Sequence, residues 1–342
     1  MKYNIAKIPI QPFSRFHFGK MKMDHDLALS DTSYFAHSDT LFSALINSAS
    51  RIEDKGQLLV DSFGTAGLKI SSLFYFIESK TDTVYLLPKP AFLNSKVVKS
   101  KDRRHKKLAG VKFVSKKVWD KGLEVTKWLD ESKYKLVQKN IIVTKEEFEA
   151  LKLNKESKIF QIDSVPKSPK HNGPKASIYY QSDIVFNDVK GCTVGLYFLY
   201  DCPKSLRINF ANALHLAALS GFGGEINIQG RTIPAIESTL LSDEAMEFKD
   251  HNQYYANISL FNPKSEADLE AIVFHETLLR GGRFYDHLDG RSHAQVVRMI
   301  AEGALFKHDK IEGRLVSIGT DMNGNTIMRN GIPLLIPINY ER

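Results

Sequence analysis

Cysteine is scarce in this chain. Only Cys192 and Cys202 occur among its 342 residues, and they do not form a Cys-x-x-Cys pair. Two cysteines argue against a disulfide framework or a cysteine-based zinc site, and they fit a reducing compartment. No run of about 18 apolar residues occurs, so no transmembrane helix is expected. The N-terminus is too interrupted by polar residues for a signal peptide. We expect a cytoplasmic protein without a membrane partner.

Several catalytic and cofactor-binding motifs are also missing. There is no Walker A pattern, no Gly-x-Ser-x-Gly elbow and no His-Glu-x-x-His pair. Asp24-His25-Asp26 holds residues that can bind metal, but adjacent side chains do not readily converge on one ion. We therefore expect no metal and no cofactor.

Acidic residues are rare in one basic segment. The segment 94–121 holds eleven Lys or Arg and two acids, so it carries +9, whereas the whole chain carries +8. Such a concentration of positive charge suits a polyanion, most often a nucleic acid. A solvated basic loop is the alternative interpretation.

The hydrophobic pattern predicts a βαββαβ order in the first two thirds of the chain. Its opening elements are a strand over Tyr3–Phe13, a helix over about 39–53 with Ser38 as N-cap, and a hairpin of Ile70–Ile77 with Val84–Leu87. The closing elements are a hairpin of Ser177–Phe186 with Thr193–Tyr200, a helix over about 204–219, and a strand over Arg231–Leu241. This order is that of a split ferredoxin-like domain.

The domain division follows from this order. We expect a ferredoxin-like domain over 1–243, a hairpin within about 171–200, and an insertion over about 92–170 with weak helices. The stretch Ser164–Pro174 is proline-rich and predicts a loop. A second, degraded ferredoxin-like domain is expected over 244–342. It ends in a meander whose last strand, with Pro333 and Pro337, lies at a sheet edge. The fold class is therefore α+β with tandem domains.

A glycine-rich stretch, Ser220–Arg231, follows the second helix. Glycines at 221, 223, 224 and 230 allow a positive φ or the close approach of another group to the backbone. The stretch follows a helix and precedes a strand, the reverse of the dinucleotide-binding order. Two interpretations remain, a cradle of backbone N–H groups for an anionic ligand and a plain tight turn.

His37 precedes the first helix and has two interpretations. It could act as the general base of a metal-independent RNA cleavage. A histidine that holds the structure or contacts RNA is the alternative.

Six short motifs, taken in order, resemble a known family. These are His37–Leu45, Ile70–Phe74, Leu87-Pro88-Lys89-Pro90, Gly221–Gly230, Arg280-Gly281-Gly282-Arg283 and Arg329-Asn330-Gly331. Together they resemble the RAMP subunit of type III-A CRISPR (Csm) complexes that caps the 5′ end of the guide RNA.

The resemblance implies a function. It implies tandem ferredoxin-like (RRM-like) domains, binding of the repeat-derived 5′ tag of the crRNA, and no nuclease activity in this subunit. The implied partners are the large polymerase/cyclase-type subunit and the first backbone RAMP subunit, with target RNA as an indirect partner. The resemblance also implies that the hairpin over about 171–200 is a thumb hairpin, which displaces a base pair between guide and target.

Candidate RNA-binding residues follow from this role, because single-stranded RNA is held by backbone contacts, stacking and polar side chains. The N-terminus of the helix at Ser38 could also attract a phosphate. Tyr179 and Tyr180 could stack on bases or face a core. The candidates are His17, Lys20, His37, Ser38, Lys89, Tyr179, Tyr180, Gly221, Phe222, Gly223, Gly224, Gly230, Arg231, Gly282 and Arg283.

Overall fold

The structure is a computed structural model. It describes residues 1–21, 29–52, 55–94, 103–168, 178–224, 241–249, 254–286, 290–321 and 324–339. Among these residues, no helix is both long enough and apolar enough to span a membrane.

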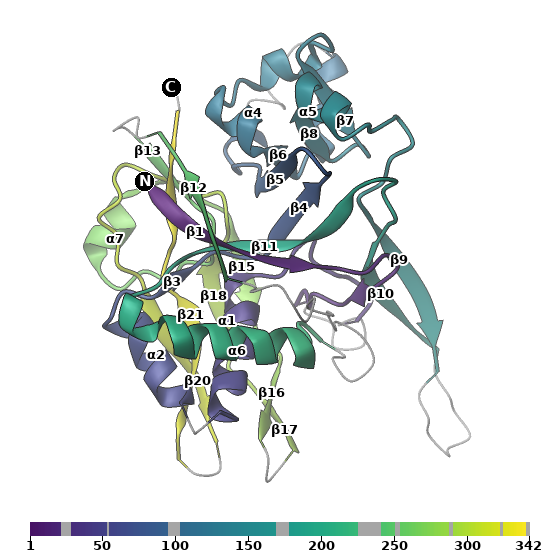
Figure 1. Cartoon of the computed structure of the whole chain (residues 1–342). Helices are drawn as coiled ribbons and strands as arrows, with labels where there is room; N and C mark the ends of the chain where they lie inside the picture. Colours follow the sequence, from purple (N-terminus) through teal and green to yellow (C-terminus); the bar gives the residue numbers. More distant parts are fainter. Residues whose placement is uncertain are drawn as a thin grey trace.

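The largest sheet is built around a ferredoxin-like core (Figure 1). Strands β1 (Lys2–Pro9), β4 (Phe74–Glu78), β11 (Thr193–Asp201) and β12 (Leu241–Glu247) are its four core strands. The fourth strand pairs with the first, the first with the third, and the third with the second, all antiparallel. This pairing confirms a βαββαβ core, but its third strand is β11 and not the predicted strand over Val84–Leu87, which lies beyond β4 as β5 (Thr83–Pro88). The short strand β3 (Lys69–Ile70) also pairs with β11.

Three helices belong to this core. They are α1 (Ser38–Ser50), α2 (Gly56–Gly64) and α6 (Arg207–Ser220), the last preceded by the single turn η4 (Lys204–Leu206). The predicted helices at 39–53 and 204–219 are thus confirmed. Helix α6 lies against the sheet because Phe210 packs edge-on against Phe198 and beside Tyr200 of β11. Burial of this apolar stripe fixes the helix on the sheet.

The insertion is a folded subdomain with short helices of five and six residues. The predicted hairpin of β4 with β5 (Thr83–Pro88) is confirmed, and β5 then continues the large sheet through three further strands. Trp119 and Trp128 are buried here, and the apolar run Ile141–Val143 fills the centre of the added sheet. The sheet therefore runs unbroken into the insertion, which lies at one end of the molecule (Figure 1). Its elements are η2 (Arg103–Gly110), β6 (Phe113–Ser115), α4 (Lys116–Asp120), η3 (Val125–Leu129), β7 (Tyr134–Val137), β8 (Ile141–Thr144) and α5 (Lys145–Ala150).

The thumb hairpin differs from the prediction. Strand β10 (Tyr179–Phe186) pairs with β9 (Phe160–Lys167) and with the short β2 (Arg15–Phe16), whereas β11 belongs to the large sheet. The predicted pairing of 177–186 with 193–200 is therefore wrong, and so is the predicted loop over the first residues of 164–174. β9 and β10 form a ribbon that projects from the body of the molecule (Figure 1).

The last third of the chain is mostly β-structure. A four-stranded sheet has the order β14-β19-β13-β22, and three separate antiparallel pairs are formed by β15–β18, β16–β17 and β20–β21. β22 lies at the sheet edge as predicted, but it pairs with β13, so the predicted three-strand meander is wrong. The elements are β13 (Tyr254–Asn257), α7 (Glu266–Glu270), β14 (Ile272–Phe274), β15 (Thr277–Arg280), β16 (Arg283–Asp286), β17 (Gly290–His293), β18 (Val297–Ile300), β19 (Leu305–Phe306), β20 (Arg314–Thr320), β21 (Thr326–Gly331) and β22 (Leu335–Ile338).

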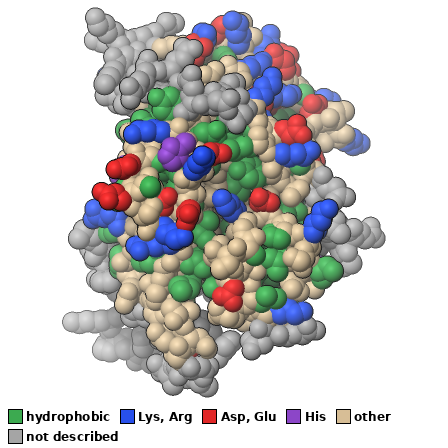
Figure 2. All heavy atoms as spheres, turned by 90° about the vertical axis from the view of Figure 1, so that its left-hand side faces the viewer, with side chains coloured by type: hydrophobic (Ala, Val, Ile, Leu, Met, Phe, Trp, Pro, Cys, Tyr) green, Lys and Arg blue, Asp and Glu red, His purple; other side chains and the backbone are tan. Residues whose placement is uncertain are grey.

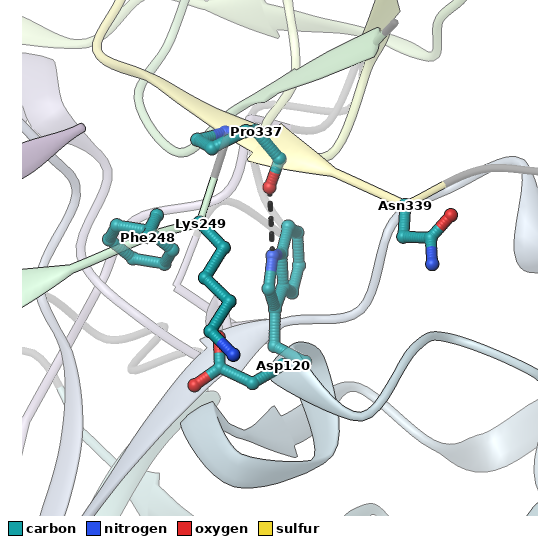
Figure 3. A pocket seen from close by; sticks show the side chains of 6 residues that line it. Asp120, Phe248, Lys249, Pro337 and Asn339 are labelled. Carbon is teal, nitrogen blue, oxygen red and sulfur yellow. Dashed lines mark hydrogen bonds between the residues drawn. The ribbon is translucent and has the colours of Figure 1, made fainter. Parts of the chain in front are cut away.

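A shallow hollow marks the contact between the insertion and the last third of the chain (Figure 3). The indole Nε1–H of Trp119 donates a hydrogen bond to the carbonyl oxygen of Pro337 at 3.1 Å. Phe248 lies beside them, and the Lys116 ammonium sits 4.6 Å from the centre of its ring. These contacts attach the inserted subdomain to β22.

Candidate nucleic-acid interface

The glycine-rich stretch is described up to Gly224, and its first part is a tight connection. Helix α6 ends at Gly221, which has φ 103°, and Gly223 has φ 91°. Gly221 takes the predicted place at the helix C-terminus, but its ψ of 162° differs from the predicted αL cap. Phe222 between them is fully buried. Gly230 and Arg231 lie outside the described residues, as does the predicted strand before Leu241.

Gly223 and Gly224 pack on the chain's own backbone. The Gly224 N–H donates to the carbonyl oxygen of His17 at 2.9 Å. A Cβ added at Gly223 would lie 2.5 Å from the same oxygen, and one at Gly224 would lie 3.0 Å from the His17 ring. The close approach that these two glycines permit is thus filled by His17, and the Gly224 N–H is not available to an anion in this structure.

His17 is itself a buried residue. Its Nδ1–H donates to the carbonyl oxygen of Ser182 on β10 at 2.8 Å, and the residue is 3% exposed. His17 therefore links Gly223 and Gly224 to strand β10 of the β9–β10 ribbon. Lys20, three residues on, is exposed and forms an ion pair with Asp31 at 3.1 Å.

The N-terminus of helix α1 is closed to solvent. His37, and not Ser38, occupies the N-cap position, and no side chain caps the helix. The Ser38 N–H donates to Ser72 Oγ at 2.8 Å, while Ser38 Oγ accepts from the Leu260 N–H at 2.9 Å. The prediction of Ser38 as N-cap is therefore wrong. Because Ser38 is fully buried, this helix end does not offer an open phosphate site.

Asp39 joins the first helix to the last third of the chain. Its carboxylate accepts from Arg280 Nε at 2.8 Å and from Arg280 Nη2 at 2.9 Å, and it also accepts from Arg329. All three residues are buried. Burial by itself raises the Asp39 pKa, but the two guanidinium groups outweigh it and hold that pKa well below its usual range. Three of the resemblance motifs thus meet in one buried ion cluster.

His37 is held on both ring nitrogens. Its Nδ1–H donates to the Glu302 carboxylate at 2.9 Å, and Nε2 lies 3.3 Å from Ser33 Oγ. Glu302 also accepts from Ser72 Oγ, and the His37 ring packs edge-on against Phe35. His37 is 8% exposed. Sequence reasoning missed Glu302, because an acid 265 residues away along the chain gives no local signal.

Lys89 is a buried cation at the end of β5. Its Nζ donates to the Leu108 carbonyl oxygen at 3.4 Å, and the residue is 8% exposed. Burial, and next the neighbouring Lys112, lower its pKa to about 8.

The remaining candidates lie in two hairpins. On the β9–β10 ribbon, Tyr180 is 56% exposed opposite Pro166, and Tyr179 is partly buried opposite Lys167. Gly282 has φ 116° with open space where a Cβ would stand, and Arg283 opens β16, paired with His293. The described candidates therefore form no single cluster.

Charge is mixed on the face that Figure 2 shows. Lysine and arginine side chains lie among acidic and hydrophobic ones, so this face presents no field of one sign. Within the described part of the chain, no group of three or more His, Cys, Asp or Glu side chains could hold a metal ion.

Comparisons with known proteins agree with this architecture. The family model of the CRISPR Csm4 C-terminal domain matches residues 250–338. The CRISPR system Cms protein Csm4 of Methanocaldococcus jannaschii is 23% identical over 388 residues, which cover 100% of this chain and 99% of the relative.

Two solved structures are similar over the whole chain. One is the Csm3-Csm4 subcomplex of the type III-A CRISPR-Cas interference complex, with TM-score 0.65, 20% identity, and coverage of 99% of this chain and 100% of the other. The second is a Csm1-Csm4 cassette in complex with pppApA, with TM-score 0.59, 18% identity, and coverage of 100% and 99%.

The fold and these likenesses define an α+β protein with ferredoxin-like architecture. Residues 250–338 match the family model of the Csm4 C-terminal domain, and the chain is similar to Csm4 along its full length. The resemblance to the RAMP subunit of type III-A complexes is thereby confirmed.

Proposed function

We propose that the chain is a non-catalytic subunit of a type III-A CRISPR ribonucleoprotein that binds the 5′ repeat-derived tag of crRNA. In this role it links the large subunit to the backbone RAMP subunits and supports antiviral defence. The observation that carries the proposal is the similarity to Csm4 along the whole chain, because relatives with this architecture occur in Csm1-Csm4 and Csm3-Csm4 assemblies. The domain division at about residue 243 belongs to the same proposal.

The β9–β10 ribbon is the part of the chain best suited to act as the thumb. It projects from the body (Figure 1) and carries Tyr180 and Ile162 exposed along its length. Exposed aromatic and aliphatic side chains on a rigid ribbon can stack on bases or separate them. We therefore assign the thumb to β9–β10, with Tyr180 as the stacking residue, in place of the pairing expected from the sequence.

A competition experiment tests the proposal. The purified chain is bound to a fluorescent RNA that begins with the repeat-derived tag, and unlabelled tag RNA or unrelated RNA of equal length is added. We expect the tag RNA to compete at least tenfold better, a difference of about 1.4 kcal/mol in binding free energy. Equal competition would reduce the chain to a general single-strand binder.

The alternative function, crRNA processing by His37, is disfavoured by the burial of its ring. A general base must reach the proton that it removes, and His37 is only 8% exposed. We expect repeat RNA to stay intact when incubated with the chain in EDTA, as followed by denaturing gel. Specific cleavage that is lost in His37→Ala would establish the enzyme instead.

A further inference from the structure

Lys89 makes few hydrogen bonds to the described residues. An ammonium group has three N–H donors. The one hydrogen bond that the Lys89 ammonium makes to described residues is the long contact with the Leu108 carbonyl oxygen at 3.4 Å. More than nine tenths of the residue is buried, and Glu276 is the described acid that acts on its charge, more weakly than burial and Lys112 do. Buried charges in proteins are normally paired, and no described residue supplies that partner to Lys89.

Lys112 stands directly opposite Lys89. The Lys89 N–H donates to the Lys112 carbonyl oxygen at 2.8 Å, next to the Pro88–Phe113 pair of the β5–β6 ladder. Side chains that face each other across an antiparallel ladder lie on the same side of the sheet. The Lys112 ammonium lies 5.7 Å from the centre of the Tyr34 ring, which holds it by a cation–π contact. Two ammonium groups therefore share one small region.

The energetics of this pair favour an anion. Burial lowers the Lys89 pKa first, and the positive charge of Lys112 lowers it further, while the exposed Glu276 opposes both effects. Like charges held together in a partly desolvated place cost free energy in the unliganded protein. A ligand with negative charge would remove this cost and fill the free donors.

The position of the pair connects it with the residues discussed above. A Cβ at Gly303 would meet the Lys89 carbonyl oxygen at 3.3 Å, and Gly303 directly follows Glu302, the partner of His37. The Ala91 N–H donates to the Gly303 carbonyl oxygen at 3.0 Å. The lysine pair thus lies where the ferredoxin-like core, the insertion and the last third of the chain meet.

We propose that Lys89 and Lys112 together bind one phosphate group of an RNA strand, with Tyr34 as a positioning residue for Lys112. This inference rests on the proposed function for the identity of the strand. It adds a built phosphate site at the β5–β6 strand ends and assigns to the insertion, through Lys112, a part in RNA binding. Two ammonium groups at paired strand ends suit a phosphodiester, which carries one charge per nucleotide.

The test compares Lys89→Met, Lys112→Gln and the double variant with the unaltered chain, by fluorescence anisotropy on tag RNA at several salt concentrations. We expect each single variant to bind on the order of tenfold more weakly, because a charge-assisted hydrogen bond is lost. The slope of log K against log salt should fall by about 0.7 for each lost phosphate contact. Lys204→Gln removes an equal charge from an exposed site beside helix α6 and should change the affinity less than twofold.

A second readout separates binding from folding. Methionine fills a volume similar to that of lysine without its charge, so Lys89→Met should melt at the same temperature or higher. Inorganic phosphate should compete with RNA for the unaltered chain at millimolar concentrations and should compete less well in the double variant. A lysine pair that only holds the fold would instead lower the melting temperature in Lys89→Met and leave RNA affinity intact in Lys112→Gln.

The outcomes also distinguish the two proposals. If the unaltered chain binds tag RNA and both lysine variants bind as tightly as Lys204→Gln, the phosphate site is wrong and the proposed function stands. If the unaltered chain binds no RNA, both proposals fail.

Discussion

Replacing Asp39 with asparagine is expected to lower the free energy of unfolding by about 3–5 kcal/mol. Asp39 accepts hydrogen bonds from Arg280 and Arg329, and all three side chains are buried. The uncharged amide of asparagine cannot neutralise Arg280 and Arg329. Their two guanidinium charges would then stay in the interior without the Asp39 carboxylate. Removal of one partner from a buried ion cluster is far more costly than loss of a surface pair.

Urea unfolding measures this effect, and the chain offers a matched control. Asp120 forms an exposed i,i+4 pair with Lys116, so Asp120→Asn should cost less than about 1 kcal/mol. If Asp39→Asn and Asp120→Asn are equally mild, the buried cluster does not join the two parts of the chain as we describe.

The same carboxylate predicts an acid dependence. The Asp39 pKa lies below its usual value in the folded protein, so its contribution to stability is complete above the unfolded pKa of about 3.9 and is lost as the pH falls below it. We therefore expect unfolding free energy to fall from about pH 4 downward, and Asp39→Asn to flatten this fall.

Replacing Gly223 with alanine is expected to cost about 3 kcal/mol or more. Gly223 has φ 91°, which strains any residue with a Cβ, and that Cβ would stand 2.5 Å from the backbone oxygen of His17. Backbone cannot move aside as the end of a flexible side chain can, so the Gly224–His17 hydrogen bond should break as well.

Gly282 provides the control for this prediction. Gly282 has φ 116° with open space where a Cβ would stand. Gly282→Ala should therefore lower the free energy of unfolding only through backbone strain, by about 1–3 kcal/mol. Thermal unfolding of both variants gives their two losses of stability. The difference between these losses measures the clash of the added Cβ with His17. Equal losses of stability would mean that Gly223 and Gly224 can move away from the His17 backbone at little cost.

Local patterns predicted the parts of the fold that are locally determined. The apolar spacing of Leu41, Phe42 and Leu45 predicts helix α1, and the turn between β4 and β5 predicts their hairpin. Strand partners are a different problem, because pairing depends on which surfaces remain free in the whole fold. β10 therefore pairs with β9, although β11 is nearer along the chain. The strands of the insertion extend the large sheet.

The motifs predicted the family better than they predicted the site. Asp39, Arg280 and Arg329 meet across separations of 241 and 290 residues, which no local pattern could indicate. The motifs predict RNA contacts at Gly223, Gly224, His17 and Ser38, yet the described contacts of these residues are with the protein itself. Short motifs shared with a family thus include residues that assemble the fold as well as residues that could bind RNA.

The most direct test of the account is purification of the affinity-tagged chain from cells that express a complete type III-A locus, followed by sequencing of the bound RNA and mass spectrometry of the bound proteins. The account predicts guide RNAs that share one fixed 5′ end with the repeat-derived tag, together with the large subunit and a backbone RAMP subunit. Recovery of the chain without RNA, or with RNA of random 5′ ends and neither partner, would contradict it.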